Sequence, residues 1–261
     1  MSTAPTTSDI ERALARLATD PPSGLSDRIL LATGVADRVA VVPGPLGPLS
    51  IVFNDNGVIG CAPAEQFDDY RSRHREREVV AVAELPSRLA VQVEKALETG
   101  KLGRLPVDLS SLTEFQQAVL RKTAEIPPGE TRPYGWVAKE IGKPGAVRAV
   151  GSALNRNPVP VLVPCHRVSK SDGHLGDYAY GAEMKRDLLA HEGLDPDAVE
   201  LLADRGVRFV GTRNGTEFCH PTCRHVKRIF PENRIEFRSQ RQAETAGYRP
   251  CKVCRPVAMA S

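Results

Sequence analysis

Residues 134–157 read YGWVAKEIGKPGAVRAVGSALNRN. Apolar residues recur at helical spacing on both sides of a central turn that contains Gly142, Pro144 and Gly145. This pattern predicts a helix, a short turn and a second helix, which is a helix-turn-helix arrangement. Because many paired helices share the pattern, it predicts local architecture and leaves the function open.

The stretch NPVPVLVPCHRV, residues 157–168, follows directly. Its β-branched residues predict a buried strand that ends at Pro164 and presents Cys165. Neighbouring side chains on an extended backbone point to opposite faces, so a turn at Pro164 is needed to aim Cys165 and His166 into one pocket. Histidine, directly or through a water, can then take the thiol proton, and Glu192 is the candidate that orients it. A buried structural thiol and a Cys-His-Glu hydrolase are the alternatives.

The flanking segments predict a mixed chain. Residues 38–62 favour strands broken by two turn sequences, and Cys61 among them is expected to be a small buried hydrophobe. A helix is predicted over about 86–100, ending at Gly100. The next helix is expected to begin with a capping box of Ser111 and Glu114. A further helix is predicted around 181–192, residues 194–206 read as a link, and residues 1–8 read as a disordered tail.

Four cysteines near the C-terminus have the spacing of a metal site. Cys219-x3-Cys223 is followed after 27 residues by Cys251-x2-Cys254. Two tight turns that each carry a cysteine pair can place four sulfurs tetrahedrally around Zn²⁺. His220 and His225 lie close by, but four thiolates already complete the shell. Disulfides are the alternative, and the cytoplasmic setting that we expect disfavours them.

The charge distribution favours a polyanionic partner. Residues 205–256 hold 12 Lys/Arg and 4 Asp/Glu, a net of +8, while the rest of the chain holds 23 and 28, a net of −5. A basic module on a mildly acidic body is typical of nucleic-acid binding, although a solvated surface gives the same count. No apolar run is long enough to span a membrane and no secretory signal is evident, so we expect a cytoplasmic protein.

Residues 157–168, with the segments on either side, resemble the acceptor region of O6-alkylguanine-DNA alkyltransferases, which carry Pro-Cys-His-Arg-Val. The resemblance covers about 112–193 well. Together with the module it implies an α+β fold with a small N-terminal antiparallel sheet and helices, a helical winged helix-turn-helix-like domain and a four-cysteine zinc module. Four parts are expected: an N-terminal extension (1–35), the alkyltransferase N-terminal subdomain (36–105), its catalytic and DNA-binding domain (106–195) and the zinc domain (205–258).

The resemblance also implies the chemistry and the roles of residues. The protein would repair double-stranded DNA as a monomer, in a single turnover that moves the alkyl group of O6-alkylguanine, and in some cases O4-alkylthymine, onto Cys165. The catalytic candidates are Cys165, His166 relaying through water to Glu192, Tyr134, Asn157 and Lys185. The candidates for contact with DNA are Arg148, Ala149, Gly151, Tyr178 and Tyr180.

Two positions depart from the family. Tyr180 stands where a small residue is usual and is expected to narrow the pocket. Pro133 stands where Ser is more usual and is expected to stiffen the entrance. Neither removes the acceptor chemistry.

The C-terminal module resembles the zinc domain of Ada, with GTRNGTEFCHPTCRH and AGYRPCKVCRP as the matching segments. That resemblance implies zinc and makes Cys219 a candidate second acceptor, for the methyl group of a methylphosphotriester. In Ada the module is N-terminal and precedes a regulatory domain, whereas here it is C-terminal. A regulator that binds DNA through zinc and responds to methylation is the alternative to a repair transferase, and the different position of the module weighs against it.

Overall fold

The computed structural model describes residues 22, 24–74 and 77–256. The tail expected at residues 1–8 lies outside them. A helix, α2 (Leu25–Ala32), precedes a sheet whose strands are β1 (Ala36–Val42), β2 (Leu49–Asn54), β3 (Gly57–Pro63) and β4 (Glu78–Ala81). Their order is β3-β2-β1-β4. The first three strands are antiparallel, as expected, but β4 runs parallel to β1, so the sheet is mixed.

Two helices accompany this sheet. The 3-10 turn η1 (Ala64–Gln66) leads into α3 (Phe67–His74), and α4 (Ser87–Thr99) follows β4. Leu89, Val93 and Ala96 form the buried face of α4. Gly100 ends the helix with φ 61°, a left-handed conformation that glycine adopts without strain. Cys61 is fully buried in the same core, as the sequence predicted.

The second part begins with α5 (Glu114–Thr123). The capping box predicted at Ser111 and Glu114 is wrong by two residues: Thr113 caps the helix and Gln116 returns the bond. Both pairs have the Ser/Thr-x-x-Glu/Gln spacing, so the local pattern does not distinguish them.

The predicted helix-turn-helix is present as α6 (Tyr134–Glu140) and α7 (Val147–Asn155). The turn between them contains Gly142 with φ 72°. Val137 and Val150 are fully buried where these helices join the main core. That core also includes the N-terminal sheet and α4, so the first two parts fold around one hydrophobic centre.

The strand predicted before Pro164 is wrong. Residues 159–164 form turns held by an isolated bridge between Pro160 and Val163. Prolines supply no N–H for a strand ladder, and Val161 has φ 70°, which a β-branched residue rarely adopts. The 3-10 turn η2 (Cys165–Arg167) follows, and β6 (Val168–Ser169) then pairs with β5 (Arg132–Pro133).

The chain continues through α8 (Ala182–His191) and α9 (Pro196–Asp204). The segment that we expected to be only a link thus contains a helix, capped by the Asp195 side chain and with Pro196 in its first turn. The last part is a sheet of order β10-β8-β7-β9 with one short helix. Its elements are β7 (Phe209–Thr212), β8 (Glu217–Cys219), η3 (Val226–Arg228), η4 (Pro231–Asn233), β9 (Arg234–Phe237), α10 (Gln240–Thr245) and β10 (Arg249–Pro250).

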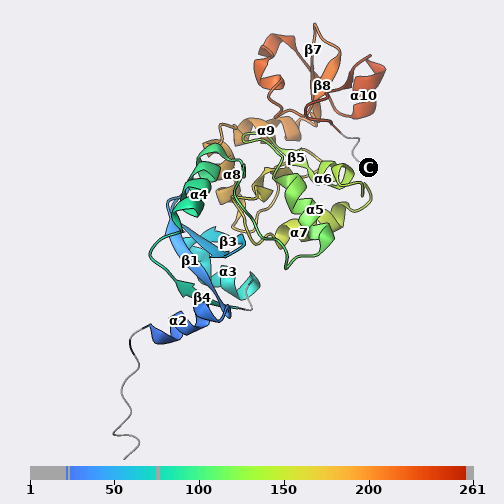
Figure 1. Cartoon of the computed structure of the whole chain (residues 1–261). Helices are drawn as coiled ribbons and strands as arrows, with labels where there is room; N and C mark the ends of the chain where they lie inside the picture. The colour runs from blue at the N-terminus through green and yellow to red at the C-terminus, as the bar shows by residue number, and fades with distance from the viewer. Residues whose placement is uncertain (1–21, 23, 75–76, 257–261) are drawn as a thin grey trace, which may run out of the picture.

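Figure 1 shows how these parts are stacked. The C-terminal module lies at one end of the molecule, next to α9, β5 and α6, and the N-terminal sheet lies on the opposite side of the central helices. The module has only small clusters of buried side chains, one of which consists largely of the four cysteines. Within the described residues, no helix is long and apolar enough to cross a membrane.

Candidate active site and metal centre

Cys165 is the first residue of η2 and is only 9 % exposed. Asn157 fixes the turn before it: its Nδ2 donates to the Val163 carbonyl (3.0 Å) and to the Cys165 Sγ (3.2 Å). Its Oδ1 accepts from the Val159 N–H at 3.0 Å. One amide side chain therefore shapes the turn and contacts the sulfur.

The environment of Cys165 acts on its pKa in opposite directions. Burial raises the pKa of the thiol, because a charged thiolate is poorly solvated there. The hydrogen bond from Asn157 and the positive charge of Lys185 oppose this rise but do not cancel it. Cys165 is therefore held as a thiol and needs a base to become a nucleophile.

His166 and Glu192 are joined directly, without the water that the resemblance implied between them. The Nε2 of His166 lies 2.8 Å from the Glu192 Oε1, and the histidine is 1 % exposed. If Nε2 donates to the carboxylate, Nδ1 is left as the basic nitrogen. Nδ1 is buried and has no hydrogen-bond partner among the residues that the structure describes. Burial lowers the pKa of His166, which keeps the ring neutral and able to accept a proton.

Glu192 is held by more than His166. Arg167 donates to it at 2.7, 3.0 and 3.1 Å, and the Gly129 N–H donates to its Oε2 at 2.9 Å. Although burial raises the pKa of Glu192, hydrogen bonds from His166 and Arg167 outweigh it and bring the pKa to about 2. The carboxylate is therefore charged at neutral pH.

No role was predicted for Arg167, which is 1 % exposed. Its Nη1 and Nη2 also donate to the carbonyls of Ile126 (2.7 Å) and Gly100 (2.9 Å). The guanidinium thus ties two further segments of the chain, at Gly100 and Ile126, to the Glu192 carboxylate. In the sequence, the one signal for a role of Arg167 is its position directly after Cys165 and His166.

Lys185 lies on α8 and is 1 % exposed. Its Nζ donates to the carbonyls of Val168 (2.7 Å), Leu175 (2.6 Å) and Asp177 (3.3 Å). Burial lowers its pKa to about 8. The ammonium group joins the segment after Cys165 to the loop that carries Tyr178 and Tyr180.

Three tyrosines border the thiol. Tyr134 begins α6, and burial followed by the nearby Cys165 raises its pKa, so its hydroxyl stays protonated. The Tyr178 ring lies edge-on to His166, with centroids 6.2 Å apart, and its centroid is 5.7 Å from that of Tyr180. The Arg73 guanidinium lies 5.5 Å from the Tyr180 ring centroid. The unusual Tyr180 is thus packed between Tyr178 and Arg73 of α3.

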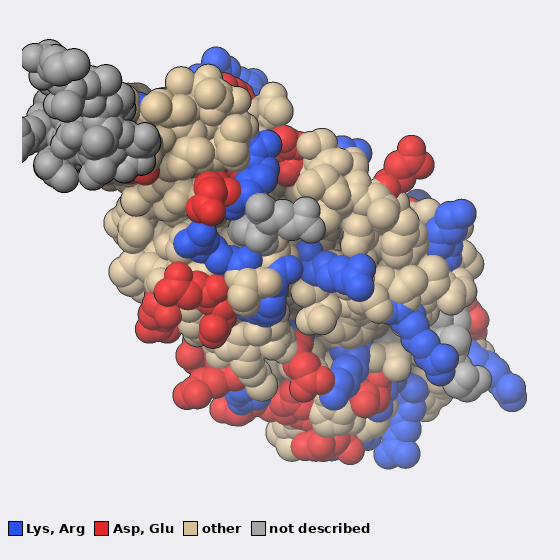
Figure 2. All heavy atoms as spheres, turned by 90° about the horizontal axis from the view of Figure 1, so that it is seen from below, with Lys and Arg blue, Asp and Glu red and all other residues tan. Residues whose placement is uncertain are grey.

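The candidate DNA-contacting residues of α7 lie in its first two turns. Arg148 and Ala149 are exposed, while Gly151 is half-buried. A Cβ atom at position 151 would lie 3.9 Å from the Tyr134 ring, which is an ordinary contact distance. Ala153, a neighbouring small residue, is buried in the core. In the view from below, Lys and Arg side chains cross the middle of the surface and continue to its right-hand side, while acidic side chains gather at the lower left (Figure 2).

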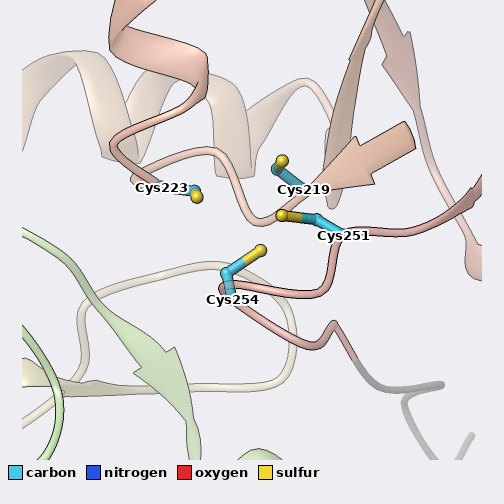
Figure 3. A group of neighbouring side chains, drawn as sticks. All are labelled: Cys219, Cys223, Cys251 and Cys254. Atoms are coloured by element: carbon cyan, nitrogen blue, oxygen red, sulfur yellow. The ribbon is translucent and has the colours of Figure 1, made fainter. Parts of the chain in front are cut away.

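The four cysteines of the C-terminal module converge. Cys219 ends β8, Cys223 follows in the next loop, and Cys251 and Cys254 lie on one turn after β10, with their sulfur atoms facing a common centre (Figure 3). All four sulfurs lie within 4.8 Å of one another, and none of them is in a disulfide. Tetrahedral Zn²⁺–thiolate bonds of about 2.3 Å fit such a set.

The thiols of this cluster lie close enough to hydrogen-bond to one another and to change one another's pKa. Hydrogen bonds from Cys219 and Cys254 lower the pKa of Cys223, while the bond to Cys223 raises the pKa of Cys219. His225 lies at the edge of the cluster, with its Nδ1 3.6 Å from the Cys251 Sγ. His220 is buried, and its backbone N–H donates to the Cys254 Sγ at 3.4 Å. The donor set is that of a Cys₄ zinc site.

Two family models match the chain. Residues 114–194 match the 6-O-methylguanine DNA methyltransferase DNA-binding domain, and residues 203–257 match the metal-binding domain of Ada. The first match includes Glu192 and the turn η2 that carries Cys165, and the second includes the four cysteines.

Similar proteins cover the rest of the alkyltransferase part. The methylated-DNA–protein-cysteine methyltransferase of Methanosarcina barkeri is 36 % identical over 162 residues, which are 58 % of this chain and 94 % of that protein. The Methanosarcina acetivorans protein of the same name is 38 % identical over 159 residues, 59 % of this chain and 97 % of that one. The Mycobacterium tuberculosis OGT crystallised with DNA is 32 % identical, with a TM-score of 0.50 over 62 % of this chain and 98 % of that chain.

Proposed function

The chain belongs to the methylated-DNA–protein-cysteine methyltransferases and carries an Ada-type metal-binding domain after its methyltransferase part. We propose that Cys165 is its alkyl acceptor. The observation that carries this proposal is the buried Cys165 thiol in the same turn as His166, whose ring is hydrogen-bonded to Glu192. The substrate is double-stranded DNA that contains O6-alkylguanine, and each protein molecule is used once.

The reaction transfers the alkyl group from the O6 atom of guanine to the Cys165 sulfur. The Nδ1 of His166, through one water, takes the Cys165 proton, and the negative Glu192 stabilises the imidazolium that forms. The thiolate then forms the S–C bond as the bond from that carbon to O6 breaks. The guanine anion that leaves is protonated, so the thiol proton ends on the base. The thioether product is not readily hydrolysed, which consumes the protein.

The base must leave the stack before it reaches this thiol, at a cost of a few kcal/mol. Arg148, exposed near the start of α7, is suited to fill the gap that the base leaves. Tyr134 remains protonated at neutral pH and can donate to the departing guanine. Lys185 and Asn157 hold the segments on both sides of Cys165 and offset part of the rise in its pKa.

The test is to incubate the protein with duplex DNA carrying O6-methylguanine, digest it and analyse the peptides by mass spectrometry. We expect one methyl group per protein, on the peptide that contains Cys165, and none in Cys165→Ala. The Cys61 peptide is the internal control, because this second buried thiol of the alkyltransferase part lies outside the relay. Turnover beyond one equivalent, or methylation that survives Cys165→Ala, would refute the acceptor role.

The metal centre supports a second transfer, from a methylphosphotriester to Cys219. Cys219 is the least buried of the four cysteines, 4 % exposed against 0 to 1 % for the others. Bound Zn²⁺ would keep the four sulfurs deprotonated and therefore nucleophilic. The Cys219 sulfur would bond to the methyl carbon as the carbon–oxygen bond breaks, which leaves a phosphodiester anion.

This second transfer has its own measurement. The zinc-loaded protein is incubated with duplex DNA that carries methylphosphotriesters and no O6-methylguanine. We expect a methyl group on the Cys219 peptide and an unmodified Cys165 peptide. An unmodified Cys219 peptide in protein that contains one zinc would limit the module to a structural or DNA-docking role.

A further inference from the structure

The C-terminal module packs against the segment that leads into α6 (Figure 1). Thr222, the residue before Cys223, is 5 % exposed and accepts a hydrogen bond from the Thr131 N–H at 2.8 Å. Its hydroxyl also lies 3.2 Å from the Thr131 carbonyl, to which it can donate. This side chain therefore ties the first cysteine turn of the module to the alkyltransferase part.

Trp136, the one tryptophan of the chain, makes the second connection. It lies two residues after Tyr134 and is 3 % exposed. Its Nε1 donates to the backbone carbonyl of Cys254 at 3.0 Å. A residue of the four-cysteine cluster is thus bonded, through its own backbone, to the helix that begins at the acceptor pocket.

Arg255 strengthens this contact from the module side. Its guanidinium lies 5.7 Å from the Trp136 ring centroid and forms a 2.8 Å ion pair with Glu140 at the other end of α6. Its φ is 44°, a left-handed conformation that residues with a side chain seldom adopt. Such a conformation persists where the surroundings over-determine it, and the ion pair and the ring contact are the interactions that do so here.

The segment held by the module is also held by the acceptor turn. Arg132 pairs with Val168 and Pro133 with Ser169 in the β5–β6 ladder, directly after η2. At its other end the segment is fixed by the Gly129 N–H bond to Glu192. Residues 129–133 therefore lie between the relay and the metal module, and α6 with Tyr134 follows them.

We propose that Trp136 is a positioning residue for the transfer, through which the metal-loaded module holds the helix that begins with Tyr134 in place beside Cys165. Metal binding orders the turn that ends at Cys254, because the Cys254 sulfur belongs to the metal site. The carbonyl of that same residue then offers a fixed acceptor to the indole. Coupling of this kind is reciprocal, so the docked α6 also stabilises the metal-bound turn.

This inference rests on the acceptor role of Cys165, and its test separates the two. The full-length protein with one equivalent of zinc is compared with the same protein after chelation, as wild type and as Trp136→Phe. Single-turnover transfer from O6-methylguanine duplex is measured over a range of DNA concentrations. The rate constant at saturating DNA and the half-saturating concentration are then reported separately.

We expect Trp136→Phe to lower the saturating rate constant about five-fold, the scale of one lost buried hydrogen bond, with less than a two-fold change in half-saturation. Chelation should slow the wild type by a similar factor and slow Trp136→Phe by much less, because the connection is already broken. In the wild type, chelation should also shift the fluorescence of Trp136 to longer wavelength as the indole meets water.

Two variants complete the design. Thr222→Val removes one hydroxyl, keeps Trp136 as the reporter and should also slow transfer, which covers the case in which Trp136→Phe folds poorly. Arg241→Gln changes an exposed arginine on α10 and is the control for a substitution elsewhere in the module, which should leave the transfer rate unchanged.

Equal effects of chelation on the wild type and on Trp136→Phe would overturn the proposal, as would unchanged Trp136 emission after chelation. If loaded wild type leaves Cys165 unmethylated, the acceptor assignment itself is wrong.

Discussion

Replacing Glu192 with glutamine removes one negative charge and preserves the shape of the side chain. In the native protein the pKa of this carboxyl is about 2, compared with an ordinary value of 4.5. Burial raises the pKa, but the hydrogen bonds from His166 and Arg167 dominate. A shift of that size corresponds to about 3 kcal/mol of folding stability. Breaking a buried ion pair by neutralising one partner costs a similar amount, about 3–5 kcal/mol.

The sign of the pH dependence follows from the lowered pKa. The stabilisation is present above the unfolded pKa of 4.5 and is lost as the pH falls toward the folded value of about 2. We therefore expect Glu192→Gln to cost about 3 kcal/mol at neutral pH and roughly half of that near pH 3. The transfer rate should also fall about 100-fold, because the imidazolium of His166 loses its counter-charge.

Urea unfolding of both proteins at several pH values, followed by far-UV circular dichroism, measures the stability difference. Glu98→Gln, which changes an exposed carboxylate on α4, is the control and should stay within about 0.5 kcal/mol of wild type. A cost below about 1 kcal/mol at neutral pH, or an equal cost at neutral pH and near pH 3, would refute the charge-pair reasoning.

Three further results are expected. Because the pKa of the Cys165 thiol is raised, the single-turnover rate constant should increase with pH between about 7 and 9 as the thiolate fraction grows, and a flat profile would contradict this. Asn157→Ala removes the hydrogen bond to the sulfur and should lower the neutral-pH rate about ten-fold, measured by peptide methylation over time, whereas equal rates would exclude that role. Tyr180→Gly should raise the rate for O6-benzylguanine relative to O6-methylguanine about ten-fold, and an unchanged ratio would show that this ring does not limit adduct size.

The helix-turn-helix could be predicted from the sequence because its signals are local. The spacing of apolar residues predicts α6 and α7, and the Gly and Pro residues between them predict the short turn that separates them. The four-cysteine site could be predicted for a similar reason, since each cysteine pair lies on one short turn. These are features in which neighbours in sequence are also neighbours in space.

The turn before Cys165 was misread because propensity and backbone chemistry conflict there. Val159, Val161 and Val163 favour a strand, but the prolines among them cannot donate to a ladder. The left-handed Val161 shows that tertiary contacts decide this conformation. The helix at 196–204 was not predicted, although its start has a local signal. Asp195 is a favourable N-cap residue and Pro196 is favourable in the first turn of a helix.

The long-range contacts of the site carry no local signal. Trp136 and Cys254 are separated by 118 positions and still share a hydrogen bond. Lys185 reads as an ordinary helical lysine, and only the fold shows that its ammonium is enclosed by three carbonyls. The sequence can suggest which residues belong to the site, but the tertiary structure determines which of them are in contact.

The raised pKa of Cys165 is consistent with a protein that reacts once. A thiolate exposed to solvent would react with any small electrophile or oxidant, and each such event would inactivate one molecule. Burial to 9 % exposure and a raised pKa keep the sulfur protonated. His166 and the charged Glu192 can still draw the proton away when a base occupies the pocket. In the proposed mechanism, low resting reactivity and transfer to the correct substrate would depend on the same two features, the buried Cys165 thiol and the His166–Glu192 pair.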